Sequence, residues 1–406
     1  MNILVINCGS SSLKYQLIDM TDESVLCKGL CERIGDAGSC ITHQAHDQKW
    51  KEEAPMPTHT EAFAKVVEKM TAGEGKVIDD ISEIGAIGHR GAHGGEAFKS
   101  SVLVNDEVIE TYDKLSPLAP LHNPAGVQGL KSAMAVFGKD VPNALVFDTS
   151  FHATMPAKAF MYALPYEYYE KYGIRRYGFH GTSHRYVSLT LADYLDMDPK
   201  DLKVVTCHLG NGSSITAVDG GKVVDTSMGM TPLSGLIMGT RAGDMDPSIP
   251  GYLMQQTGMS AAEVDEMLNK KSGLSGVSGV SSDNRDVRKA ADENDERSQL
   301  AVDMLAYQIR KYIGAYAAAM GGIDSVVFTG GIGENDARIR QEVCKNMEFL
   351  GISIDEKKNE RRGMEINDIS AYNSRVAVVV ICTNEELMIA RDTLALVQAK
   401  EAEKSK

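Results

Sequence analysis

A glycine- and serine-rich turn occurs twice in the chain, each time between two strand-like segments. Residues 5–19 read VINCGSSSLKYQLID, and residues 204–224 read VVTCHLGNGSSITAVDGGKVV. In both, an apolar run enters the turn and an alternating run leaves it, which predicts an antiparallel hairpin. Such turns present backbone N–H groups and hydroxyls together, which suits an anion with several oxygens. One such turn usually marks only a hairpin. Its repetition predicts two related halves that hold a polyphosphate from opposite sides.

Composition limits the classes of function. The 406 residues suffice for two domains, and the net charge of −14 argues against nucleic-acid binding, which needs clustered basic residues. An anionic substrate must therefore be held by local arginines. The longest apolar run, 376–382, fits one buried strand and not a membrane span. We expect no secretory signal, no membrane partner and a cytoplasmic location with the seven cysteines reduced.

Zinc is a weaker interpretation of the cysteine and histidine pattern. The group Cys27, Cys31, Cys40, His43 and His46 fits no regular zinc spacing. The pairs His89/His93 and His180/His184 have an i, i+4 spacing, but each encloses a glycine, which argues against the helix that a zinc pair needs. We therefore expect no zinc site.

The remaining pattern predicts an α/β protein with mixed sheets. Capping boxes at Thr58/Glu61 and Ser260/Glu263 predict helix starts, Asn123-Pro124 begins a helix that Gly138 ends, and a long helix ends at Met320. Buried strands are expected at 86–88, 144–148, 325–330 and 376–382. Segments 238–251 and 273–286 read as long loops.

A third glycine-rich segment lies at 328–336, FTGGIGEND. It follows an apolar strand and is expected to form a turn before a helix spanning 338–347. A strand that ends in Gly-Gly lets a flat ligand or a phosphate approach the backbone. Since neither a P-loop nor a strand–GxGxxG–helix pattern occurs, this turn and the two hairpins are the predicted walls of a nucleotide site.

Arginines and histidines gather in glycine-framed loops. GHRGAHGGE (88–96) carries Arg90, MTPLSGLIMGTR (230–241) ends on Arg241, YGFHGTSH (177–184) carries His180, and His122 precedes a helix N-terminus. Three apolar residues accompany them: Leu121, Phe179 and Pro232. We expect a small, partly apolar pocket with a cationic floor.

Two carboxylates begin the last helix. Thr383 is expected to cap it, with Glu385 and Glu386 in its first turn. Carboxylates at this position suit the helix dipole, and this role is sufficient to account for Glu386. Glu385 is the candidate to face the site and hold a hard cation through oxygen.

Together these motifs resemble the acetate kinase family of the sugar kinase–Hsp70–actin superfamily. The resemblance rests on NCGSSSLK, GHRGAHGGE, PLHNP, FDTSFH, YGFHGTSH, HLGNGSS, MGTR, GGIGEN and TNEE, which occur in the family's order across almost the whole chain. It implies a two-domain ATPase fold, with a mixed sheet flanked by helices in each domain. The implied domains are residues 1–150 joined by the helix 385–406, and a nucleotide-binding domain, 151–384.

The resemblance also implies a reaction. Members transfer the γ-phosphoryl group of ATP to acetate, giving acetyl phosphate and ADP, reversibly and with Mg²⁺, for which Mn²⁺ is an alternative. They are usually homodimers. Transfer is expected to be direct and in line, because phosphoryl transfer needs positioning and charge neutralisation more than covalent help.

Site residues carry over by position. Arg90, Asp148, His180 and Arg241 are the implied catalytic residues. Acetate would contact Arg90, Ala92, Leu121, His122, Phe179 and Pro232. The nucleotide would contact Ser10, Ser12, Lys14, His208, Leu209, Gly210, Asn211, Gly212, Asp283, Asn284, Arg285, Gly331, Ile332, Gly333, Glu334 and Asn335. Asn7 and Glu385 would bind the metal.

Asp148 is interpreted as an orienting group rather than a base. A carboxylic acid with a pKa of about 4–5 is already ionised at pH 7, so the acceptor needs no deprotonation. Asp148 would instead orient Arg90, Arg241 or a metal-bound water.

The alternative functions differ in the molecule that accepts the phosphoryl group. A propionate-preferring kinase is the nearest one, because the family loop commonly reads GHRVVHGGE where this chain has Gly91 and Ala92. An actin- or Hsp70-like ATPase would not need the arginine and histidine loops. A sugar kinase normally stacks aromatic side chains on its substrate, and the single tryptophan, Trp50, lies in a polar stretch.

Overall fold

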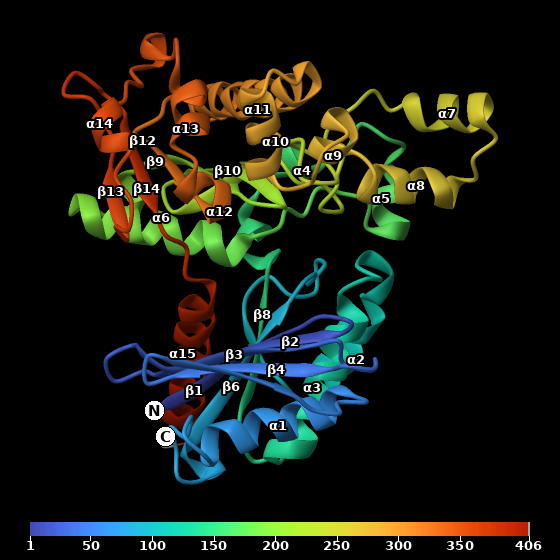
Figure 1. Cartoon of the computed structure of the whole chain (residues 1–406), viewed down its shortest axis with the longest axis vertical. Helices are drawn as coiled ribbons and strands as arrows, with labels where there is room; N and C mark the ends of the chain where they lie inside the picture. The colour runs from blue at the N-terminus through green and yellow to red at the C-terminus, as the bar shows by residue number, and fades with distance from the viewer. Residues whose placement is uncertain (405–406) are drawn as a thin grey trace. The chain divides into compact units, whose positions relative to one another are not determined.

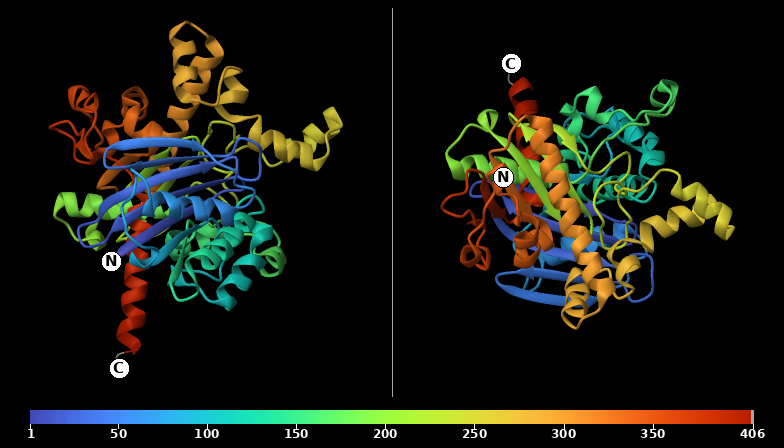
Figure 2. Two further views of the ribbon diagram at one scale, coloured as in Figure 1. Left: turned by 60° about the horizontal axis from the view of Figure 1, so that its bottom comes forward. Right: turned by 90° about the horizontal axis from the view of Figure 1, so that it is seen from above.

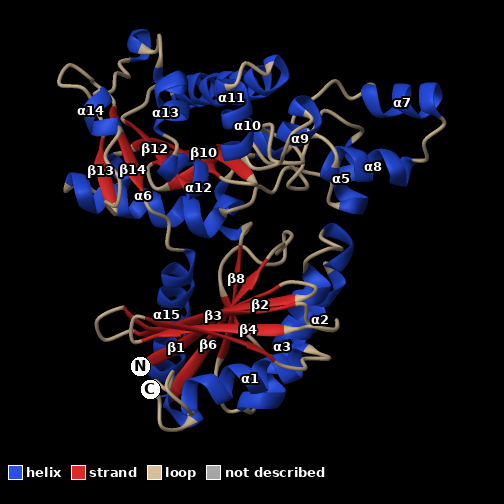
Figure 3. Cartoon of the chain, in the orientation of Figure 1, coloured by secondary structure: helices blue, strands red, loops and turns tan. Residues whose placement is uncertain are grey.

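The computed structural model describes residues 1–404, which divide into two compact units. The first unit joins Met1–Phe151 to the C-terminal segment from Asn384, and the second spans His152–Thr383. Each unit contains a mixed β-sheet flanked by helices (Figures 1 and 3). The predicted α/β fold class is confirmed.

The sheet of the first unit has the strand order β5-β4-β3-β2-β1-β6-β8-β7. The strands are β1 (Asn2–Cys8), β2 (Ser12–Asp19), β3 (Ser24–Glu32), β4 (Cys40–Ala45), β5 (Gln48–Glu53), β6 (Ile84–Gly91), β7 (Val102–Leu103) and β8 (Asn143–Phe147). β1 and β2 form the predicted antiparallel hairpin, in which Asn7 pairs with Lys14. β1, β6 and β8 run parallel, so their carboxyl ends meet at one edge.

Helices cover both faces of this sheet. They are α1 (His59–Thr71), α2 (Asp106–Lys114), α3 (Asn123–Phe137) and α15 (Glu385–Lys404). Leu4 and Ile6 of β1 pack in one core with Phe63 of α1 and Phe137 of α3. α15 contacts β1, β6 and β8. Its approach to β6 requires Gly88, because a Cβ there would lie 2.5 Å from the Thr393 hydroxyl.

The sheet of the second unit repeats this arrangement, in the order β11-β10-β9-β12-β14-β13. Its strands are β9 (Lys203–Leu209), β10 (Ser213–Asp219), β11 (Lys222–Thr226), β12 (Ser325–Thr329), β13 (Ile366–Asp368) and β14 (Ala377–Ile381). β9 and β10 form the second predicted hairpin, and β9, β12 and β14 run parallel. The strand series β11-β10-β9-β12-β14 thus matches β3-β2-β1-β6-β8 in order and direction.

Two long helices pack on the second sheet. The helices of this unit are α4 (Ala157–Phe160), α5 (Tyr166–Tyr172), α6 (Gly181–Leu195), α7 (Ile249–Thr257), α8 (Ala261–Lys270), α9 (Gly273–Ser278), α10 (Asn284–Asp292), α11 (Glu296–Met320), α12 (Gly330–Asn335), α13 (Ala337–Cys344) and α14 (Glu356–Asn359). Leu305 and Ile309 of α11 share a core with Val205 and Cys207 of β9. α6 contacts β9, β12 and β14.

The expected helix starts are confirmed. α1 and α8 begin with the capping boxes of Thr58 and Ser260, α3 begins at Asn123 and is followed by Gly138, and α11 ends at Met320. Segment 238–251 has no regular structure until α7 begins at Ile249. α7 and α8 extend away from the sheet of their unit (Figure 2).

Three local predictions were wrong. Segment 273–286 is not one loop, because α9 spans Gly273–Ser278 and α10 begins at Asn284. The GGIGEN segment is not a turn but helix α12, and the helix after it is α13, which spans Ala337–Cys344. α6 begins at Gly181, so the glycine between His180 and His184 starts a helix instead of preventing one.

Candidate active site

Polar and charged side chains gather in the first unit where its parallel strands end. Asn7 lies near the end of β1, Arg90 near the end of β6, and Asp148 directly after β8. A small pocket there is lined by Asn7, Lys14, Arg90, Glu385 and Glu386, with three neighbours, Val5, Tyr15 and Ile389. We call Asn7, Lys14, Arg90, Asp148, Glu385 and Glu386 the carboxylate–arginine cluster.

Arg90 and Asp148 form a two-pronged ion pair within this cluster. Arg90 Nε donates to Asp148 Oδ1 at 2.9 Å, and Nη2 donates to Oδ2 at 2.6 Å. Asp148 is 3% exposed, and its backbone N–H donates to Gly91 O at 2.9 Å. The nearby carboxylate raises the pKa of Arg90. The guanidinium is therefore a fixed cation, and of the three partners considered for Asp148 the structure pairs it with Arg90.

The two glutamates at the start of α15 have different surroundings. Glu386 forms an ion pair with Lys14 of β2. Burial raises the pKa of Glu385 to about 7. The positive charge of Arg90 acts in the opposite direction and offsets only part of this rise. The helix is capped by Asn384 and not by Thr383 as expected, because Leu387 N–H donates to Asn384 Oδ1 at 3.0 Å. Thr383 instead shares a hydrogen bond of 2.8 Å with Ser183.

The other candidates in the first unit differ in exposure. Ser10 is exposed and Ser12 half-buried in the β1–β2 turn, which Gly9 N–H closes by donating to Ser12 O at 2.8 Å. Ala92 is half-buried, directly after β6. Leu121 is 70% exposed, and His122 is exposed at the N-cap of α3.

In the second unit, His180 precedes helix α6 in a left-handed conformation with φ 58°. This conformation is uncommon for a residue with a side chain. His180 Nδ1 lies 2.9 Å from Ser214 Oγ, and its ring stacks on that of His208 with centroids 4.3 Å apart. The hydroxyl and the second ring fix the direction of the His180 imidazole.

Arg241 lies next to this histidine pair. A Cβ built on Gly212 would stand 3.3 Å from Arg241 Nη1 and 3.6 Å from His180 Nε2, so both side chains approach the turn between β9 and β10. Arg241 Nη1 donates to Pro232 O at 3.3 Å. We call His180, His208, Gly212, Ser214 and Arg241 the histidine–arginine cluster.

Apolar side chains adjoin the histidine–arginine cluster. Phe179 packs with Met228 and Met238 in a small buried group. Met238 Sδ lies 3.7 Å from Arg241 Nη1. An aromatic ring and two thioethers therefore pack beside the Arg241 guanidinium.

A cavity of about 730 Å³ lies in the second unit. Eight predicted nucleotide contacts line it: Gly210, Asn211, Asp283, Asn284, Arg285, Gly331, Ile332 and Asn335. The sequence patterns missed six further lining residues: Ser282, Arg288, Asp336, Ala337, Arg338 and Arg362. Asp336 organises the cavity wall, because Asn284 Nδ2 donates to it at 2.7 Å and Arg288 Nε at 2.5 Å. We call this the nucleotide cavity.

Five predicted nucleotide contacts in this unit do not line the cavity. They are His208, Leu209, Gly212, Gly333 and Glu334. Leu209 and Gly333 are buried. Glu334 Oε1 accepts hydrogen bonds from Gly330 N–H at 2.9 Å and Thr383 N–H at 3.1 Å. The carboxylate of Glu334 therefore braces the start of α12.

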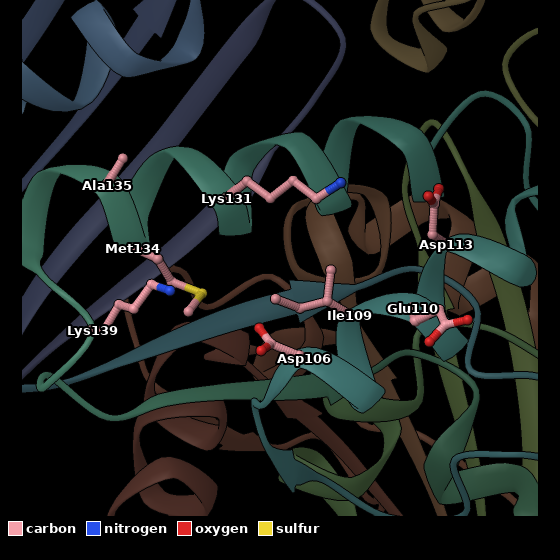
Figure 4. A pocket seen from close by; sticks show the side chains of 8 residues that line it. All are labelled: Asp106, Ile109, Glu110, Asp113, Lys131, Met134, Ala135 and Lys139. Carbon is pink, nitrogen blue, oxygen red and sulfur yellow. The ribbon is translucent and has the colours of Figure 1, made fainter.

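A second cavity, of about 470 Å³, lies between α2 and α3. Figure 4 shows Asp106, Glu110 and Asp113 of α2 on one side and Lys131 and Lys139 on the other. It contains no predicted site residue. Within residues 1–404 we find no group of three or more histidine, cysteine, aspartate or glutamate residues arranged to hold a metal, and no helix long and apolar enough to cross a membrane.

The fold and these sites define a phosphotransferase built from two α/β units. Residues 2–391 match the model of the acetokinase family, and the chain belongs to that family. Acetate kinase of Thermotoga maritima is 55% identical over 401 residues, covering 98% of this chain and 99% of that protein. The crystal structure of Porphyromonas gingivalis acetate kinase superposes with a TM-score of 0.94 at 47% identity, covering 98% and 99%. A propionate kinase structure from Francisella tularensis gives 0.90 at 41% identity, covering 97% and 99%.

Proposed function

We propose that this protein transfers the γ-phosphoryl group of ATP to the carboxylate of acetate, forming acetyl phosphate and ADP, and that it also catalyses the reverse reaction. The observation that carries the proposal is the two-pronged Arg90–Asp148 pair. The pair presents a fixed guanidinium beside a pocket lined by carboxylates, asparagine and lysine. Such a guanidinium can bind a small carboxylate, and the neighbouring side chains can bind a metal–phosphate group.

The second unit supplies the nucleotide end of the proposed reaction. Gly331 has no atom within 4 Å of a built Cβ, so a base or ribose can approach the α12 backbone closely. Ile332 provides an apolar contact, and Arg285 and Arg338 provide positive charge at the cavity wall. We propose that adenosine occupies the nucleotide cavity and that the phosphates lie toward the Gly210–Gly212 turn.

The proposed chemistry requires charge neutralisation rather than a base. Acetate is ionised at neutral pH, so its oxygen attacks the γ-phosphorus without losing a proton. Arg90 would hold the carboxylate, and Asp148 would keep the guanidinium in one orientation. Arg241 and His180 would donate hydrogen bonds to the equatorial oxygens as the phosphoryl group moves.

A divalent cation, Mg²⁺ in this proposal with Mn²⁺ as the alternative, fits the carboxylate–arginine cluster. Glu385 is a half-buried carboxylate beside Glu386 and Asp148, and a cation there would compensate its charge. Asn7 offers a second oxygen ligand. Mg²⁺ commonly binds through one or two protein oxygens together with waters and substrate phosphates, so two ligands suffice. The ion would shield the β- and γ-phosphate charges.

An acceptor panel tests this function. Purified protein with ATP and Mg²⁺ is offered acetate, glycerol, glucose or no acceptor, while ADP and acyl phosphate (trapped with hydroxylamine) are measured. We expect ADP and hydroxamate in equal amounts with acetate, and neither with the other additions. ADP release without an acceptor indicates a chaperone-like ATPase, and turnover with glucose indicates a sugar kinase.

Propionate is the second candidate acceptor, and one observation favours it. The side chain two residues after Arg90 is only the methyl group of Ala92, which is half-buried. A methylene in an apolar pocket is worth about 1–3 kcal/mol, so a small side chain here would weaken discrimination against propionate. Values of kcat/KM for acetate, propionate and butyrate decide between the two.

We also propose a cytoplasmic homodimer. Helix α7 has no buried residue, although its sequence is IPGYLMQQT, and Tyr252 is 60% exposed. A helix with apolar side chains and no buried residue suits a protein–protein contact. Light scattering after gel filtration tests the proposal, since a mass of one chain would contradict it.

A further inference from the structure

Two side chains of helix α11 hold the loop that carries Arg241. Ile237 N–H donates to Gln308 Oε1 at 2.6 Å, and the Tyr312 hydroxyl donates to the Asp244 carboxylate. Gln308 and Tyr312 are four residues apart and therefore lie on the same face of the helix. The loop that carries Arg241 spans residues 235–244. Gln308 contacts it near its beginning, at Ile237, and Tyr312 contacts it at its end, at Asp244.

Asp244 closes this loop on itself. Its Oδ1 accepts from Gly235 N–H at 2.8 Å, and its own N–H donates to Gly235 O at 2.8 Å. Inside the loop, Met238 N–H donates to Arg241 O at 3.1 Å. Gly243 has φ +74°, and a Cβ there would stand 2.6 Å from Gly235 O. The backbone around Arg241 thus has one tightly specified path.

Arg241 differs from Arg90 in what holds its side chain. Asp148 fixes Arg90 by two charged hydrogen bonds, whereas in the described part of the chain Arg241 donates only to Pro232 O and Met238 Sδ. Neutral partners give a guanidinium little directional preference. Its position therefore depends on the loop backbone, and the loop depends on Asp244 and on α11.

We propose that Tyr312 is a positioning residue for phosphoryl transfer: through Asp244, and together with Gln308, it sets the place of Arg241. This inference rests on the proposed function, in which Arg241 stabilises the transferring phosphoryl group. A donor displaced by about 1 Å loses much of its value in the transition state, while binding of ATP elsewhere is unaffected. The loss therefore falls on kcat.

The first test is Tyr312→Phe, which removes only the hydroxyl. We expect kcat to fall about tenfold while KM for ATP stays within about twofold. The matched control is Tyr307→Phe on the same helix, where the ring is 65% exposed, and it should retain wild-type kcat. A second pair guards against misfolding. Asp244→Ala should lose a similar factor. Asp244→Asn should retain most of kcat, because the amide oxygen can still accept from Gly235 N–H while the amide NH2 donates to the Tyr312 oxygen.

The deciding measurement combines Tyr312→Phe with Arg241→Lys. If Tyr312 acts through Arg241, the double variant should be no slower than Arg241→Lys alone, within about twofold. A merely structural role predicts that the two losses multiply, which would overturn the inference, as would an unchanged kcat in Tyr312→Phe. Failure of the proposed function looks different, because Arg241→Lys by itself would then remain nearly as active as the wild type.

Discussion

Arg90 and Asp148 come from neighbouring parallel strands and meet at their carboxyl ends, with both carboxylate oxygens of Asp148 accepting from the same guanidinium. Asp148 follows Phe147, which pairs with Gly91 next to Arg90, so the sheet register itself brings the two side chains together. This places a rigid cation where a carboxylate substrate is proposed to bind.

Asp148→Asn tests the orienting role of this carboxylate. The variant keeps the shape of the side chain but replaces one charged acceptor, so kcat should fall by about 10²-fold. Activity should not return between about pH 6 and 9, because acetate needs no base in that range. The control is Asp140→Asn, an exposed position just before β8, which should have no effect. Steep recovery at high pH would assign Asp148 a proton-transfer role instead.

Two adjacent glycines in α12 should respond differently to alanine. Gly331 lines the nucleotide cavity with open space at its Cβ position, so Gly331→Ala should leave Tm unchanged and raise KM for ATP several-fold. Gly330 has φ +77°, and its Cβ would stand 2.7 Å from Leu209 O, so Gly330→Ala should destabilise the fold by about 1–3 kcal/mol. Equal KM values for ATP in Gly331→Ala and the wild type would contradict the proposal that the nucleotide binds against α12.

His89 makes stability depend on pH. Burial lowers its pKa from 6.5 to about 4, and its ring lies 2.8 Å from Asn143 Oδ1. Between about pH 6.5 and 4 the unfolded chain binds a proton that the folded chain does not. The free energy of unfolding should therefore fall as pH drops through this window, by at most about 1.4 kcal/mol per pH unit for this group. Urea titrations of wild type and His89→Gln should differ by that slope, and parallel curves would refute the assignment.

Ala92→Val should narrow the choice of acceptor. Adding two methyl groups beside Arg90 should lower kcat/KM for propionate relative to acetate by about tenfold. Ala97→Val, an exposed change in the same loop, is the control. Gly91 is not expected to leave room of its own, because its Cβ position is 2.5 Å from the Phe147 ring. If both variants and the wild type show the same ratio, Ala92 does not face the acceptor.

The sequence predicted the elements whose signals are local. Both hairpins, the two capping boxes and the buried strands follow from turn chemistry and periodicity. Helices α9 and α12 could not be predicted, because glycine and serine have poor helix propensity and long-range contacts decide there. Leu274 N–H donates to Met238 O at 2.8 Å in α9, and in α12 buried Arg340 donates to Gly333 O at 2.8 Å.

The residues of the candidate site also fall into two groups: those marked by a local sequence pattern and those that only the packing reveals. Residues in glycine-framed motifs, such as Arg90 and Arg241, were found because their surroundings were unusual. Arg288 and Arg362 line the nucleotide cavity but lie in ordinary polar stretches, so only the packing of α10 and of the segment after α14 reveals them. The partnership of Tyr312 with Asp244 joins residues 68 positions apart, and no local pattern marks it.

The central claim, direct transfer of the phosphoryl group to a carboxylate, is tested most directly by a single turnover. Enzyme in excess is mixed with ATP labelled with ³²P at the γ-position, Mg²⁺ and acetate, and the reaction is quenched at successive times. The account predicts that label appears in acetyl phosphate at the rate at which ADP forms, and that no ADP forms without acetate. Label found first on the protein, or released as inorganic phosphate, would contradict it.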